Sequence, residues 1–60
     1  MPPQQLKQAR QALGLTQAEI AALMGRDTRT WQYWEAGKYP IPASSQKLLE
    51  FLLKEKGIKS

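Results

Sequence analysis

The chain has 60 residues, which is enough for one domain, and a domain of this size is only marginally stable. It contains no cysteine and no histidine, which excludes disulfides and thiolate zinc sites and removes the commonest general base and metal ligand. Nine Lys and Arg against five Asp and Glu give a net charge of +4, which suits a nucleic-acid partner, although many soluble domains carry as much charge. No apolar run approaches the roughly 20 residues that span a bilayer, and no signal-peptide pattern begins the chain. We therefore expect a cytoplasmic protein that is not an enzyme and uses no metal or cofactor.

The first predicted helix runs from about Pro3 to Leu13. Proline is well tolerated in the first turn of a helix, because its missing N–H is not needed there. Leu6, Ala9 and Leu13 recur at spacings of three and four, which indicates one apolar face. Gly14 is expected to end this helix in a left-handed conformation.

The second predicted helix follows a capping box formed by Thr16 and Glu19. It runs to about Met24, and Gly25 can take the positive φ that ends it. Ala21 supplies a small residue at the point where two helices would cross. The sequence therefore predicts a short helix followed by a tight turn.

The third predicted helix runs from Thr28 to about Ala36, with Asp27 as its N-cap and Gly37 at its end. Trp31 and Trp34 are three residues apart, so they share one face, which we assign to the core. Together with the preceding helix this segment is typical of a helix-turn-helix, in which the second helix lies in the DNA major groove.

The fourth predicted helix runs from about Ala43 to Glu55, after a short loop in which two prolines flank Ile41. Its apolar arc is about 200° wide, which exceeds what one core requires and suggests a dimer surface. The alternative is that a small domain leaves apolar surface exposed anyway. The residues assigned to the dimer surface are Leu49, Phe51, Leu52 and Leu53. We expect the tail from Lys56 to Ser60 to fray.

The outer face of the third helix carries the residues that we expect to contact bases: Thr28, Arg29, Gln32 and Tyr33. The guanidinium of Arg29 can pair bidentately with guanine, and Gln32 suits adenine if the helix is tilted far enough. The alternative for Arg29 is a solvated surface charge, which the helix-turn-helix context makes the weaker interpretation.

Phosphate contacts are expected from the edges of this surface, where they set register without reading sequence. Gln17 is at the start of the second helix, where free N–H groups attract an anion. The other predicted phosphate contacts are Arg26, Lys38, Tyr39, Lys7 and Arg10. Arg10 is assigned first to a structural ion pair with Glu35, because both residues neighbour core positions, and only second to phosphate.

The chain resembles the Cro/cI-type helix-turn-helix family, also called the XRE family. The resemblance covers about Leu6 to Ile41 and rests on the segments LGLTQAEIAALMG and TRTWQYWEAGK. It implies base contact at Thr28, Arg29 and Tyr33, phosphate contact at Gln17, and the ion pair between Arg10 and Glu35. Two residues depart from the family pattern: Arg26 stands where an apolar residue is usual, and Trp31 is larger than the usual Val or Ile.

The resemblance also implies a function. Members are typically prokaryotic or phage transcription repressors that bind palindromic operators as dimers. The closing segments WEAGKYPIP and LLEFLL are more similar to compact members such as antitoxins and anti-CRISPR-associated regulators, which typically repress their own operon. We therefore expect residues 1–60 to form one all-α, four-helix domain of the lambda-repressor-like type, a homodimeric repressor in a prokaryotic cell or phage-infected host. The alternative is an antitoxin-like module that neutralises a partner protein and binds DNA secondarily.

Overall fold

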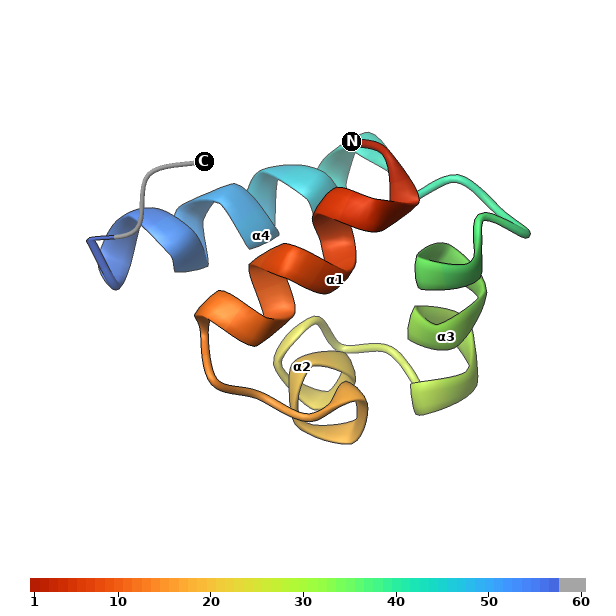
Figure 1. Ribbon diagram of the computed structural model, residues 1–60, viewed down its shortest axis with the longest axis horizontal. Coiled ribbons are helices and arrows are strands. Elements are labelled where there is room, and N and C mark those ends of the chain that lie inside the picture. Colours follow the sequence, from red (N-terminus) through yellow and green to blue (C-terminus); the bar gives the residue numbers. More distant parts are fainter. Residues whose placement is uncertain (58–60) are drawn as a thin grey trace.

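The computed structural model describes residues 1–57 and confirms an all-α fold. Four helices follow one another along the chain: α1 (Pro3–Ala12), α2 (Gln17–Leu23), α3 (Thr28–Ala36) and α4 (Ala43–Glu55). Helix α3 packs against both α2 and α1. As Figure 1 shows, α3 lies at one end of the molecule and the C-terminal half of α4 at the other. The described residues contain no β-strand.

The helix boundaries follow from local capping chemistry. The capping box of α2 is present: the Thr16 hydroxyl accepts from the Glu19 N–H at 3.1 Å, and the Glu19 carboxylate accepts from the Thr16 N–H at 2.9 Å. Asp27 caps α3 by accepting from the Thr30 N–H at 3.0 Å. Helices α1 and α2 end one residue before the predicted boundaries, because Leu13 and Met24 are their C-cap residues. Of the tail expected to fray, residues 58–60 lie outside the described residues.

Gly37 ends α3 with a φ of 78°, so that the Lys38 N–H donates to the Tyr33 carbonyl at 2.9 Å. A Cβ at Gly37 would lie 3.1 Å from the Pro3 ring, which packs against this turn, whereas a Cβ at Gly25 would meet nothing within 4 Å. Gly25 has a similar φ of 69°.

Gly37→Ala is therefore expected to destabilise the domain by more than the ~1–2 kcal/mol that a left-handed L-residue costs. Gly25→Ala is the matched control, because it introduces the same backbone strain without a steric contact. The difference between their free energies of unfolding, measured by urea titration, reports the Pro3 contact. Equal losses in the two variants would contradict this close packing.

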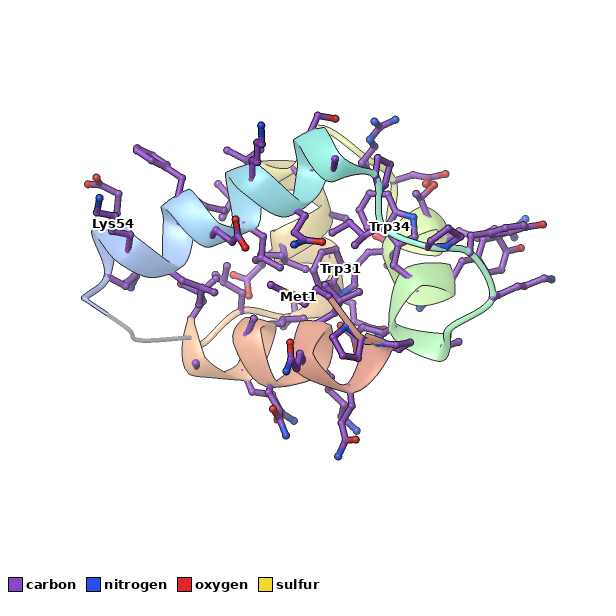
Figure 2. All side chains as sticks on the ribbon, turned by 90° about the horizontal axis from the view of Figure 1, so that it is seen from above. Met1, Trp31, Trp34 and Lys54 are labelled. Carbon is purple, nitrogen blue, oxygen red and sulfur yellow. The ribbon has the colours of Figure 1, made fainter. Side chains whose placement is uncertain are left out.

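The core lies where all four helices meet. Trp31 and Trp34 occupy its centre, with 0% and 4% of their surfaces exposed, and their rings pack edge to face with centroids 5.8 Å apart. Figure 2 shows both rings in the interior, whereas Lys54 lies at the end of α4 remote from α3. The inward direction predicted for both tryptophans is confirmed. The other buried apolar residues are Leu6, Ala9, Leu13, Ile20, Ala21, Met24, Leu49 and Leu53.

The structure corrects two assignments on α4. Leu49 and Leu53, which the sequence analysis placed on a dimer surface, are buried in the core of the monomer, with 0% and 4% exposed. They are not available to a partner, because the core itself uses that side of the apolar arc. Leu52 is half-buried and packs against the core. Among the four residues assigned to the dimer surface, Phe51 is the one that stays exposed, at 55%.

The N-terminal residue ties α1 to α4. The Met1 amino group donates to the side-chain oxygen Oε1 of Gln46 at 3.0 Å, and the Met1 side chain packs against the core. In Figure 2 Met1 lies beside the buried tryptophans. The start of the chain therefore helps to hold α4 in place.

Candidate nucleic-acid interface

The outer face of α3 carries the predicted base-contacting residues together. Trp31 and Trp34 point inward, so at about 100° per residue Arg29, Gln32 and Tyr33 lie on the opposite side of the helix and Thr28 lies at the edge of that side. Arg29 and Gln32 are exposed, and Thr28 and Tyr33 are half-buried. Among residues 1–57 the Arg29 guanidinium makes no hydrogen bond or ion pair. It is therefore free to bind a ligand.

An aromatic and cationic cluster extends this face at the C-terminal end of α3. The rings of Tyr33 and Tyr39 meet edge to face with centroids 5.4 Å apart, and the Lys38 ammonium lies 4.7 Å from the Tyr33 ring centre and 5.9 Å from that of Tyr39. Cation–π attraction holds the ammonium against the two rings. The structure thus brings together a predicted base contact and two predicted phosphate contacts.

Gln17, the first residue of α2, contacts the same face. Its side-chain oxygen Oε1 accepts from the side-chain amide of Gln32 at 3.1 Å, and its side-chain Nε2 donates to the Glu35 carboxylate at 3.4 Å. Sequence reasoning assigned Gln17 to phosphate and Gln32 to bases and missed this contact, because it depends on how α2 crosses α3. The small residue at Ala21 indicates a crossing, but no local pattern in the sequence shows which polar side chains meet there.

The expected ion pair between Arg10 and Glu35 is present. The Arg10 Nε donates to the Glu35 carboxylate at 2.7 Å, and a second guanidinium nitrogen donates to the Leu15 carbonyl at 3.0 Å. The side chains are 15% and 7% exposed, so Arg10 is mainly structural. The indole N–H of Trp31 also donates to Glu35. The indole of Trp31 therefore supplies a hydrogen-bond donor to Glu35 that a Val or Ile could not.

The carboxyl groups that hold this fold have lowered pKa values. Burial raises the pKa of Glu35, but hydrogen bonds from Arg10 and Trp31, with the charge of Arg10, outweigh it and bring the pKa below the ordinary 4.5. The cap hydrogen bonds also lower the pKa of Glu19, through the Thr16 backbone and side chain, and that of Asp27, mainly through Thr30. The folded state therefore binds fewer protons than the unfolded chain in acid.

The free energy of unfolding is expected to stay nearly constant from neutral pH to just above the ordinary carboxyl pKa. It should decrease once the pH is lower than about 4.5. The loss occurs as the pH falls through the lowered folded-state pKa values. Urea titrations between pH 7 and pH 3 measure this dependence. Glu35→Gln should show a weaker dependence than the wild type, and a wild-type stability that is unchanged at pH 3 would contradict the assignment.

Two predicted phosphate contacts lie apart from these networks. Lys7 on α1 and Arg26 in the turn after α2 are exposed, and no hydrogen bond or ion pair within residues 1–57 joins either side chain to the α3 face. The described residues also contain no group of three or more potential metal ligands. No helix in the described part of the chain is both long and apolar enough to cross a membrane.

A short helix, a glycine turn and a second helix with an outward polar face define a helix-turn-helix domain, a class for which DNA is the indicated partner. The chain belongs to the helix-turn-helix domain family, whose sequence model matches residues 4–52. It is also 36% identical over 56 residues to the Type II methyltransferase M.MspI of Moraxella sp. That match covers 93% of this chain but 13% of the methyltransferase. No solved structure matches the chain.

Proposed function

We propose that this domain is a sequence-specific DNA-binding transcriptional repressor of the Cro/cI (XRE) type. The observation that carries the proposal is the outer face of α3, where the unpaired Arg29 lies on the same helix as Gln32 and next to the Tyr33, Lys38 and Tyr39 cluster. In a helix-turn-helix such a face enters the major groove, where an arginine can read guanine and flanking cations bind phosphates.

The proposed repressor acts by occupying its operator, and we propose that the operator belongs to its own operon in a phage or mobile element. Such a protein works in the cytoplasm of a prokaryotic cell or infected host. We propose binding and no catalysis, since the chain has no histidine or cysteine. The methyltransferase activity of the relative is not proposed here, because the match covers 13% of that protein.

A gel-shift titration of the purified protein on the DNA upstream of its own gene tests the proposal. Scrambled duplex serves as competitor at near-physiological salt, because non-specific affinity depends steeply on salt. Tight binding that resists the competitor is the expected result. Binding that the competitor abolishes would leave only the affinity of a basic protein for DNA, and would favour the antitoxin-like alternative.

We further propose that the repressor is a homodimer on an inverted repeat, with two α3 helices about 34 Å apart, one DNA turn. Phe51 and Leu48 on α4 are 55% and 38% exposed and lie one turn apart, so they form a small apolar surface. Contact between two copies there leaves both α3 helices free for DNA.

Phe51→Glu is expected to give monomers in sedimentation equilibrium. Operator affinity should fall on the order of 100-fold or more, because the second half-site no longer binds as part of one molecule. Leu23→Glu is the matched control, since Leu23 on α2 is as exposed as Phe51, at 54%. A Phe51→Glu variant with an unchanged sedimentation mass would exclude this surface as the dimer contact.

A further inference from the structure

A chain of hydrogen bonds runs from the partly buried ion pair of Arg10 and Glu35 to the outer face of α3. Arg10 donates to Glu35 at 2.7 Å, the Gln17 amide donates to Glu35 at 3.4 Å, and the Gln32 amide donates to the Gln17 carbonyl oxygen at 3.1 Å. These side chains come from α1, α3 and α2. The contacts connect the partly buried charge of Glu35 with a side chain on the candidate DNA surface.

The ion pair sets the direction of every hydrogen bond in this chain. A guanidinium only donates, and an ionised carboxylate only accepts. Gln17 must therefore turn its amino group toward Glu35 and its carbonyl oxygen toward Gln32. If the Gln17 amide were reversed, its carbonyl oxygen would face the Glu35 carboxylate. The assignment of the amide atoms thus follows from the chemistry of the neighbours.

The same logic fixes what Gln32 presents to the outside. One of its two N–H groups is used by Gln17, which leaves its carbonyl oxygen and its second N–H on an exposed side chain. A donor beside an acceptor is the pattern that complements adenine N7 and N6 in the major groove.

We propose that Gln17 is a positioning residue that holds Gln32 in the orientation for adenine readout. The proposal rests on the proposed DNA-binding function and deepens it. A residue that contacts only phosphate acts on all sequences alike. A positioning role makes the effect of Gln17 depend on the base that Gln32 faces.

The hydrogen-bond chain is tested first in the free protein by NMR. In Gln17→Met, which keeps the side-chain length but removes the hydrogen bonds, the Gln32 side-chain amide signals should shift and exchange faster with water. Gln11→Met, on an exposed residue of α1, is the matched control and should leave these signals unchanged. Thermal melts verify that both variants are folded. Gln32 signals in Gln17→Met that match the wild type would overturn the proposal.

The readout is then tested on duplexes selected by the wild type from a randomised library. At the base pair where Gln32→Met loses the preference for adenine, Gln17→Met should lose it too. The ratio of affinities for adenine and for the other bases at that position should fall by roughly 5- to 150-fold. The double variant should lose little more than either single variant, because the residues act as a unit. Uniform weakening on all sequences by Gln17→Met, with additive losses in the double variant, would overturn the positioning role.

The two tests separate this inference from the proposed function. A wild type that selects no sequence would overturn the proposed function and adenine readout together, whatever the NMR signals show. Specific binding by the wild type, with no adenine preference at any position sensitive to Gln32, would overturn the inference alone.

Discussion

Glu35→Ala is expected to lower the free energy of unfolding by ~3 kcal/mol, the lower end of the loss for a buried ion pair, because Arg10 and Glu35 are partly buried. The variant leaves the Arg10 guanidinium, which is 15% exposed, with the Leu15 carbonyl as its remaining partner. It also removes the acceptor of the Trp31 indole N–H, on a side chain that is fully buried. A domain of this length has a total stability of roughly 3–9 kcal/mol, so the loss is a large fraction of the total. Far-UV circular dichroism with urea titration measures the loss.

Two variants show whether this loss comes from the unpaired groups. Glu50→Ala removes an exposed glutamate from α4 and should change the stability by less than about 0.5 kcal/mol. Arg10→Met combined with Glu35→Met removes both charges, so it should be more stable than Glu35→Ala. The recovery should be incomplete, because the Trp31 N–H still lacks an acceptor. If Glu35→Ala were as stable as Glu50→Ala, the ion pair would contribute nothing to the fold.

Local chemistry explains why the helices could be predicted. The capping box at Thr16, the cap at Asp27 and the turn at Gly37 each depend on residues within a few positions of one another. Hydrogen bonds over such distances form in almost any tertiary context, so the pattern alone predicts them. The ion pair of Arg10 with Glu35 spans 25 residues, but both residues neighbour predicted core positions. Their proximity followed once the core was assigned.

The remaining features depend on how the helices are oriented against one another. A helical wheel gives the width of the apolar arc on α4, but not which part of it the monomer core uses, so Leu49 and Leu53 were misassigned. The contact between Gln17 and Gln32 depends on the crossing of α2 and α3. The cluster of Tyr33 and Tyr39 requires the loop after Gly37 to fold back along α3. None of these arrangements has a signal in sequence spacing, and which residues touch DNA stays a prediction.

Arg29→Ala is expected to abolish the preference for the operator while weak binding to any duplex survives. An arginine that pairs bidentately with guanine contributes ~1–3 kcal/mol of discrimination against the wrong base. In a dimer the loss occurs in both half-sites, so the combined effect on operator affinity is ~2–6 kcal/mol. Arg29 is exposed and makes no hydrogen bond or ion pair within residues 1–57, so its removal should leave the fold intact. Gel-shift titrations on operator and scrambled duplex measure the change in their affinity ratio.

Lys38→Ala is the matched control, because it also removes one exposed cation from the same surface. A phosphate contact is blind to sequence, so this variant should weaken binding to operator and scrambled duplex by the same factor and reduce the salt dependence of both. Arg29→Ala should instead lower the affinity for the operator far more than that for the scrambled duplex. Equal losses on both duplexes in Arg29→Ala would show that Arg29 binds the backbone, and base readout would then rest on Gln32 and the other residues of the α3 face.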